Sequence, residues 1–585
     1  EHRLTELGVG NRRIATIFEM SYQELEERQR RMFRLCALNP APDFAAAAAA
    51  ALTGFDPDVT RELLDDLVDV HLLNPAGRDR YTFHDLLRIF GKEKAHLEDG
   101  DQNCRRAVDR LFEWIARSAR AAAIIRRPKR QSLPVTVDHP EIAPTVFADR
   151  PAALDWFATE EQSLSCVVHG ARQHRRPGIA CQVIDAMRGY FFHRVDRLKW
   201  RSLAEVGLAI AREQDDPVAE AAMCHSLGLA ATLQGEYPSG IALYEHGVAL
   251  TRRSGDEQRR VELLLGLAGA QSQTGAHHAT AECAQEAIEL TRQHDDLMLS
   301  GALHMIGVTC WESGDLEQGA RHLQEAVALD RHLGEDTLDD ILSTLSIVYT
   351  DLGMLNSAYG CAAESLSLGE GMGSVHSQAS ALQNLAGVHL ERGHFAQAET
   401  AATRALKLAI DSNLDKHVAF SSLNLGLARL ESDPEQARDL LASCQATARD
   451  LNMGMTQIES LIGLSRAYRR LGDKANTLHY AAKAVDVAEH TGLPLAEAKA
   501  RTVLAAAQLE HDDLSSAEET ANRALDRHVA SGHLLGAART RLVLSRIRSR
   551  QGRLEEAETL HAAAARIYQQ VGTPFPLLAD RSTHG

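Results

Sequence analysis

The stretch LHMIGVTCWESGDLEQGARHLQEAVALDRHLG (residues 303–334) decides the fold, because it predicts two helices joined by a turn at Gly314. Its first half is an apolar helix that carries the pair Ile306-Gly307. Its second half carries small residues at Gly319 and Ala326. Small residues at such points let neighbouring helices approach closely and interlock.

The same arrangement recurs along the chain, which makes an internal repeat the first feature to test. The corresponding turn glycines are Gly235, Gly275, Gly314, Gly353, Gly393, Gly472 and Gly552. Consecutive ones are 39 or 40 residues apart, and the gaps of 79 and 80 residues each hold one further turn, Ser432-Asp433-Pro434 or His511-Asp512-Asp513. The small positions of the second helices repeat as Gly319, Ala398, Ala517 and Ala557, then Ala326, Ala405, Ala524 and Ala564. Val195-Asp196 indicates a further, degenerate unit, so about 9–10 repeats are predicted.

The repeat resembles the tetratricopeptide (TPR) pattern of Leu-Gly, Tyr, Gly, Ala and Ala, with Cys310 in the usual tyrosine position of one unit and Tyr349 in that of the next. No single helix pair can bury its own apolar face, so the units must stack into a superhelix whose first helices line a concave groove. The predicted fold is all-α, a right-handed TPR superhelix over residues 153–572. A composition of 44% hydrophobic but only 5% aromatic residues, mostly Ala and Leu, suits such close helix packing.

Charge and cysteine usage narrow the class of protein. The net charge of −17 opposes binding of a phosphate backbone, so no direct nucleic-acid partner is expected. The nine cysteines are scattered without a CxxC motif, as in reduced cytoplasmic proteins. No apolar stretch is long enough to span a bilayer, so no membrane partner is expected. Because the chain opens at Glu1, we expect it to be a piece of a longer cytoplasmic protein.

Residues 14–98 lack the repeat and predict a different module. Helices are expected over residues 21–38, 44–53 and 59–71, with Pro57 ending the second and Asp58 or Thr60 capping the third. Two strands, Leu72-Leu73 and residues 81–83, should follow. Three helices and a hairpin indicate a winged-helix arrangement. Its third helix carries Glu62, Asp65, Asp66 and Asp69, which disfavours DNA binding through that helix.

This module resembles the winged-helix domain of NB-ARC/STAND signalling ATPases, and its combination with a TPR array is similar to the C-terminal half of AfsR-like regulators of the SARP class. The resemblance is carried by Phe18, Ser21-Tyr22, Leu25, Phe33-Arg34, Leu38, Asp43-Phe44, Leu64, Leu67-Val68, Leu72-Leu73, Tyr81 and the block His84-Asp85-Leu86-Leu87-Arg88. It implies that residues 1–13 are the remnant of a small helical domain after a missing NB-ARC domain. Residues 99–152 would then be a bridging helix with a Pro-rich linker, and residues 573–585 a disordered tail.

The resemblance gives His84 and Asp85 a role in sensing nucleotide. In that family the histidine of this pair contacts the phosphates of ADP held by the preceding domain, which the donor N–H of an imidazole can do. The alternative is a histidine that only caps or packs at the start of the following helix. The loop GxxxxGK[ST] is absent, so this chain should hold no cofactor of its own, and ADP or ATP would bind in the full-length protein.

Two further sets of polar and charged residues are candidates for binding a partner. On the TPR template, Asn384, Asn424, Arg466, Arg469, Arg470, Arg539, Arg546 and Arg550 should reach the groove, where they would suit an acidic peptide or another anionic ligand. The alternative is that these residues solvate an exposed face. A basic stretch at residues 117–130 before the linker LPVTVDHPEIAP is either a partner-contacting patch or a solvated helix end.

The sequence therefore predicts the sensor half of a STAND-type bacterial transcriptional regulator. The TPR array would receive a protein, peptide or small ligand, and the winged helix would control the nucleotide state of the upstream NB-ARC domain, with oligomerisation on activation. No metal-ligand cluster, nucleophile motif or carboxylate pair stands out, so we expect no enzyme in this chain. The alternative is a constitutive TPR scaffold for protein–protein interaction without switching.

Overall fold

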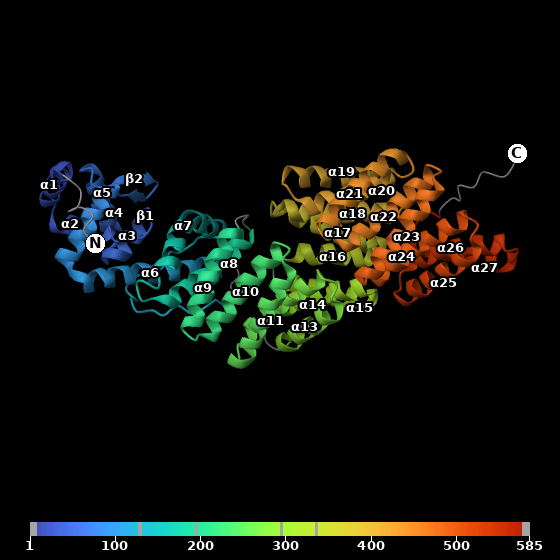
Figure 1. Ribbon diagram of the computed structural model, residues 1–585, viewed down its shortest axis with the longest axis horizontal. Coiled ribbons are helices and arrows are strands. Elements are labelled where there is room, and N and C mark those ends of the chain that lie inside the picture. The colour runs from blue at the N-terminus through green and yellow to red at the C-terminus, as the bar shows by residue number, and fades with distance from the viewer. Residues whose placement is uncertain (1–8, 127–131, 194–196, 293–295, 334–336, 576–585) are drawn as a thin grey trace. The chain divides into compact units, whose positions relative to one another are not determined.

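The computed structural model describes residues 9–126, 132–193, 197–292, 296–333 and 337–575, and it forms two units, Glu1–Ala270 and Gln271–Gly585 (Figure 1). Unit 1 begins with a small domain of helices around a short sheet. Its elements in chain order are α1 (Val9–Gln23), α2 (Glu27–Cys36), β1 (Asp43–Ala45), α3 (Ala46–Thr53), α4 (Pro57–Asp69), β2 (Asn74–Gly77), β3 (Arg80–Thr82) and α5 (Asp85–Lys94). Strand β3 lies between β1 and β2 and is antiparallel to both.

The helices of this domain differ from the predicted ones at their ends. The helix predicted over residues 21–38 is two helices, because α2 starts afresh after Glu26, whose N–H donates to the side chain of Gln29 at 2.9 Å. Helix α4 is capped by Asp56, which accepts from the N–H of Asp58 at 2.9 Å, so the predicted caps Asp58 and Thr60 were wrong. Pro57 is the first residue of α4, where its missing N–H leaves no bond unmade.

The sheet also differs from the prediction. Residues 43–45 form β1 because their backbone pairs with β3, so the helix predicted over residues 44–53 begins only at Ala46. The first strand of the hairpin is β2 at residues 74–77, and not Leu72-Leu73 as predicted. Leu72 and Leu73 directly precede β2 and are buried in the core. The rings of Phe33 and Phe83 pack at 5.4 Å in this core. The domain is tied to the repeat array by Arg80 on β3, which donates to Glu160 at 2.5 Å.

The repeat array starts earlier than predicted. After the π-helical turn η1 (Ala95–Asp99), α6 (Gly100–Arg126) packs on α7 (Arg150–Gly170) and on α8 (Pro177–His193). In the same way α8 packs on its own partner, α9 (Arg197–Glu213), and on the next first helix, α10 (Pro217–Leu233). The helix expected to bridge two domains is therefore the first helix of the array. The pair α10 and α11 (Tyr237–Ser254) follows, and then α12 (Glu257–Ser272), which crosses the division between the units.

Unit 2 is itself a stack of helix pairs, and it confirms the predicted all-α repeat fold. Its helices are α13 (His277–Thr291), α14 (Asp296–Ser313), α15 (Leu316–Leu333), α16 (Leu338–Asp351), α17 (Leu355–Gly371), α18 (Val375–Glu391), α19 (Phe395–Asp411), α20 (Asp415–Arg429), α21 (Pro434–Asp450), α22 (Gly454–Arg470), α23 (Lys474–Thr491), α24 (Pro494–Glu510), α25 (Leu514–Ala530), α26 (Leu534–Arg550) and α27 (Leu554–Val571). The last helices of unit 1 and those of unit 2 carry one repeated pattern, first helix, turn, second helix.

The turns and small residues lie where the sequence places them. All seven predicted turn glycines have positive φ between helices, from 72° at Gly393 to 86° at Gly314. The pair Val195-Asp196 lies outside the described residues. A Cβ on Gly307 would meet the Leu323 side chain at 2.6 Å, so that first helix touches its partner closely. In three other pairs the equivalent residue is a serine that donates to a carbonyl of the second helix, as Ser465 does to Thr477 at 2.8 Å.

Within unit 2, successive turns of the superhelix touch. Helix α14 contacts α24, and a Cβ on the turn residue Gly353 would lie 3.0 Å from the side chain of Val571 at the end of α27. The chain beyond α27 takes part in this packing: the Thr573 hydroxyl donates to the carbonyl of Glu391, and the Phe575 ring packs on Tyr568 at 5.2 Å. Residues 573–575 are therefore ordered, against the prediction of a disordered tail from residue 573. Residues 576–585 lie outside the described part of the chain.

Candidate functional site

His84 occupies the cap position of α5 in the N-terminal domain. Its Nδ1 accepts from the N–H of Leu86 at 3.4 Å, and both His84 and Asp85 are exposed. An acceptor Nδ1 assigns the ring proton to Nε2, so a donor group faces outward from the start of the helix. The capping role considered from the sequence is present, and it leaves the other ring nitrogen available to an anion outside this chain.

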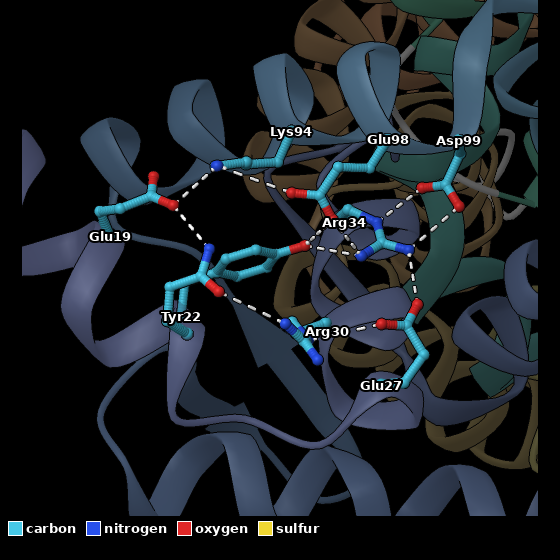
Figure 2. Close-up of polar contacts among 9 residues, drawn as sticks. Glu19, Tyr22, Glu27, Arg30, Arg34, Lys94, Glu98 and Asp99 are labelled. Atoms are coloured by element: carbon cyan, nitrogen blue, oxygen red, sulfur yellow. Dashed lines mark hydrogen bonds and ion pairs between the residues drawn. The ribbon is translucent and has the colours of Figure 1, made fainter.

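Arg34, one of the residues that carry the family resemblance, organises a polar cluster between α1, α2 and η1 (Figure 2). Its guanidinium is almost fully buried and makes two bonds to Asp99 at 2.7 and 3.1 Å and one to Glu98 at 2.7 Å. The Tyr22 hydroxyl accepts from Arg34 at 2.6 Å and donates to Glu98 at 2.7 Å, and burial raises the pKa of this tyrosine. Arg34 therefore joins α1 and α2 to η1, the turn that leads into the array.

Three of the arginines predicted to line the groove bridge neighbouring repeats instead. Arg469 pairs with Glu510 at 2.8 Å, Arg550 pairs with Asp512 at 2.6 Å, and Arg470 pairs with Glu431. All three side chains are well exposed. Exposed pairs of this kind contribute little to stability, about 0–1 kcal/mol each. They agree with the alternative that these cations solvate an exposed face.

Arg539 and the neighbouring Lys499 each meet one carboxylate on the preceding turn of the superhelix. Arg539 on α26 pairs with Glu391 at the end of α18, and Lys499 on α24 pairs with Asp351 at the end of α16 at 3.0 Å and with Glu459 at 3.2 Å. Burial alone would raise the pKa of Glu391, but Arg539 holds it below its ordinary value. We call the pairs Arg539–Glu391 and Lys499–Asp351 the cross-turn contacts. They lie between first helices, where the sequence predicts the groove.

Arg466 and Arg546 complete the predicted arginines. Both are half-buried. Burial and the nearby Arg539 lower the pKa of Arg466, while Glu459 and Glu391 act in the opposite direction. Within the described ranges, no hydrogen bond or ion pair reaches the Arg466 guanidinium. The carboxylates of Glu459 and Glu391 therefore offset its charge at longer range.

The two predicted asparagines hold repeats together. The Asn384 amide donates to the carbonyl and hydroxyl oxygens of Ser343 at 2.9 and 2.6 Å. Asn424 is buried, and its amide donates to the carbonyl of Gln383 at 2.9 Å. Each asparagine thus binds the backbone of the preceding first helix, and the expectation that these amides face a peptide is wrong for this structure. The amides do donate to a backbone, as predicted, but that backbone belongs to this chain and not to a bound peptide.

Sequence reasoning missed three polar residues on α6 and α8, and it named a fourth, Arg117, only as the start of the basic stretch. Glu113, Arg117 and Ser118 on α6 and Asp185 on α8 bind the backbone of the Pro-rich linker. No motif marks them, and the only available signal was the linker itself, which follows directly after α6. The basic stretch that begins at Arg117 is accordingly not a purely solvated helix end.

A buried ionic cluster lies beside these residues. Arg188 on α8 pairs with Asp185 at 3.2 Å and with Glu262 on α12 at 3.0 Å. Arg259 on α12 reaches Asp185 at 3.4 Å, and His225 on α10 lies 2.8 Å from Arg188. Burial would raise the pKa of Asp185, but the two arginines lower it. The cluster links three consecutive first helices, and removing one member would leave uncompensated buried charge.

Metal-binding clusters, membrane-spanning helices and pockets are the remaining features that could indicate a site. The part of the chain that the structure describes holds no group of three His, Cys, Asp or Glu side chains placed to bind a metal ion. In the same residues no helix is both long and apolar enough to cross a membrane. A pocket on unit 2 is lined by Leu514, Ser515, Glu518, Glu519, Asn522 and Gln551, none of which the sequence singled out.

Comparisons with known proteins find distant sequence similarity to AfsR regulatory proteins of Streptomyces. No family model matches the chain. It is 27% identical over 455 residues to a regulatory protein AfsR of Streptomyces griseus, covering 64% of this chain and 46% of that protein. It is 27% identical over 335 residues to the AfsR of Streptomyces coelicolor, covering 50% and 33%. The chain is thus distantly related to AfsR-type regulatory proteins and spans less than half of their length. Among solved structures, a Rap protein complexed with competence and sporulation factor has a TM-score of 0.48 at 13% identity, covering 61% of this chain and 99% of that one.

Proposed function

We propose that this chain is the sensor and control part of a STAND-type transcriptional regulator of the cytoplasm. The helix-pair array receives a protein, peptide or small ligand, and the N-terminal domain controls whether an upstream NB-ARC domain holds ADP or ATP. The distant relationship to AfsR over 455 residues supports this reading. The proposal assigns no catalysis and no bound cofactor to the chain itself.

The N-terminal domain is proposed to be a winged helix. Its order of helix, strand, two helices and two strands (α2, β1, α3, α4, β2, β3), with β3 central in the sheet, supports that assignment. The four carboxylates of α4, Glu62, Asp65, Asp66 and Asp69, are exposed. They would repel phosphates, so the domain is proposed to act on the neighbouring nucleotide domain rather than on DNA.

The observation that carries the nucleotide-control proposal is the exposed His84. Because Nδ1 is held by the N–H of Leu86, the imidazole presents Nε2–H to whatever faces the start of α5. A donor at a helix N-terminus is suited to a phosphate, since the helix dipole and free N–H groups favour an anion there. A phosphate bound in the resting state would bias the protein toward that state only if the active state lost the contact.

The test uses the natural protein with the residues that precede Glu1. We expect His84→Ala to lower the amount of ADP retained after gel filtration and to raise reporter transcription. His96→Ala is the matched control, because His96 is an exposed histidine of the same domain that pairs with Asp101. If His84→Ala changes neither ADP retention nor transcription, the chain is better described as a constitutive TPR scaffold.

A further inference from the structure

The linker between α6 and α7 is bound along the array like a peptide ligand. Residues 132–147 form no helix or strand, and their course is fixed by contacts to α6 and α8. These are the first helices of the first two pairs, the elements that line the ligand-binding face in a TPR array. The linker therefore occupies the position that a peptide partner would take in this part of unit 1.

Buried carboxylates bind the N–H groups of the linker. Asp185 accepts from the N–H of Leu133 at 2.9 Å. Glu113 accepts from the N–H groups of Asp138 and His139 at 3.0 and 3.1 Å. Glu113 and Asp185 are only 2% and 4% exposed, and a buried carboxylate is costly unless hydrogen bonds satisfy its oxygens. Each carboxylate also pairs with arginine, Glu113 with Arg117 and Asp185 with Arg188 and Arg259. The linker N–H groups complete the hydrogen bonding of both.

Side-chain donors bind the carbonyl groups of the same segment. Arg117 donates to the carbonyls of His139 and Ile142 at 3.2 and 2.7 Å, and Gln182 donates to that of Pro134 at 2.7 Å. The fully buried Ser118 hydroxyl accepts from the N–H of Thr145 at 2.9 Å. Recognition therefore alternates between donors and acceptors along the main chain, as it does for an extended peptide in a groove.

The side chains of the linker take a much smaller part in the binding. Leu133 and Phe147 are buried at its two ends, and Phe147 packs on Trp156 at 5.6 Å. Between them most side chains are exposed, among them Val137 and Pro140. Val135 and Ile142 are partly buried against the same core, and Asp138 pairs with Arg176 at 2.5 Å. The surface thus fixes a backbone course and two buried apolar anchors, with weaker side-chain contacts between them.

We infer that the face of α6 and α8 around Glu113, Ser118 and Asp185 is a peptide-binding surface, that residues 132–147 are its intrachain occupant, and that an extended segment of a partner protein with two apolar anchors displaces them. The inference rests on the proposed role of the array as a receiver. It concerns unit 1 alone and needs no upstream domain, so its failure would leave the nucleotide-control proposal standing.

The probe is a fluorescent synthetic peptide of residues 132–147. In the test variant, residues 132–146 are replaced by a Gly/Ser linker of equal length. We expect saturable binding to this variant and at least ~10-fold weaker binding to the unchanged chain, because a tethered occupant competes at an effective concentration on the order of millimolar. In the variant, Glu113→Gln should weaken binding by ~10-fold or more, whereas Glu205→Gln, an exposed change on α9, should have no effect.

Equal binding to the variant and the unchanged chain, or no loss on Glu113→Gln, would overturn the inference. Amide hydrogen exchange in the unchanged chain covers the case of a variant that does not fold. We expect the amides of Leu133, Asp138, His139 and Thr145 to exchange at least ~100-fold faster than those of α8, by local release of the segment. Exchange of these amides only together with α8 would show that the segment is part of the core and would equally overturn the inference.

Discussion

Lys499 donates to Asp351 at 3.0 Å although 148 residues separate them, and Arg539 meets Glu391 across the same separation of 148 residues. The repetition follows from the geometry of a solenoid. Each helix pair adds the same rotation and rise, so equivalent residues of successive superhelical turns come together at a constant sequence interval. The cross-turn contacts are thus a property of the superhelix, and a ligand entering between these first helices must separate them.

Exchanging the charges of the first pair tests this relationship. We expect Lys499→Asp and Asp351→Lys each to destabilise the contact between α16 and α24 by about 2 kcal/mol, because each leaves like charges together in a largely buried site. The double exchange should recover at least half of that loss. Hydrogen exchange of peptides from α16 and α24 measures the effect. Additive losses in the double variant would show that the two side chains do not interact.

The turn glycines provide an independent test of the same packing. Gly353 and Gly472 have similar φ values of 76° and 78°, so alanine at either should cost about 1 kcal/mol in backbone strain. Of these two glycines, Gly353 alone would bring an added Cβ against another turn of the superhelix, at 3.0 Å from Val571. We expect Gly353→Ala to lower the free energy of unfolding by about 1 kcal/mol more than Gly472→Ala, in urea titrations followed by circular dichroism.

Replacing Val571 by alanine supplies the control. The difference between the two glycine variants should disappear in that background, because the obstructing methyl group is gone. If the difference persists, the turn of Gly353 does not pack on α27 as the structure shows.

Glycines inside the first helices should divide into two groups. A Cβ on Gly307 would clash with Leu323 at 2.6 Å, whereas nothing lies within 4 Å of a Cβ on Gly387. Gly307→Ala should therefore destabilise the chain by about 1–3 kcal/mol through overpacking, and Gly387→Ala should stabilise it by about 0.5–1 kcal/mol through helix propensity. Opposite signs in the thermal midpoints are the expected result. The same sign for both would contradict the close packing of α14 on α15.

The sequence predicted what depends on local spacing and missed what depends on the path of the superhelix. Gly314 and Gly307 were identifiable because a turn and a close helix contact each need a particular residue at a fixed interval. Asn424 was misassigned because a template of a single repeat gives one position to two different roles, facing the groove and contacting the neighbouring first helix. In the structure Asn424 has the second role. Lys499 could not be paired with Asp351, since that contact depends on rotation accumulated over several repeats.

Arg34 should dominate the stability of the N-terminal domain. Arg34→Met leaves Glu98 and Asp99 without their main cation, and we expect a loss of about 3 kcal/mol. Arg34→Lys should recover little of it, because an ammonium cannot reproduce the two bonds to Asp99. Arg30→Met is the control on the same helix, since Arg30 makes only looser contacts, with Glu27 at 3.4 Å and with Gln23 at 3.5 Å. Hydrogen exchange in α2 and α5 measures the loss, and equal effects of Arg30 and Arg34 would contradict the central position of Arg34.

Protonation of buried histidines should weaken unit 2 as the pH falls. His528 is almost fully buried between Thr502 at 3.2 Å and His533 at 3.0 Å, and burial together with the charges of Lys499 and Arg539 lowers its pKa to about 3. The unfolded chain, with an ordinary histidine pKa of about 6.5, therefore binds the proton first. The free energy of unfolding should be constant well above about pH 6.5 and should fall as the pH drops from there toward 3. The decline should be at most about 1.4 kcal/mol per pH unit for each such histidine.

We expect His528→Gln to flatten, but not abolish, the decline in the urea midpoint between pH 7.5 and 5. Burial also lowers the pKa of His304 and of His417 to about 4, so part of the dependence should remain. His278→Gln is the matched control, because that side chain is 90% exposed on α13 and its removal should leave the slope unchanged. An identical slope in His528→Gln and the unchanged chain would mean that this ring is accessible to protons in the folded state, and that the closed packing of α24, α25 and α26 opens readily in solution.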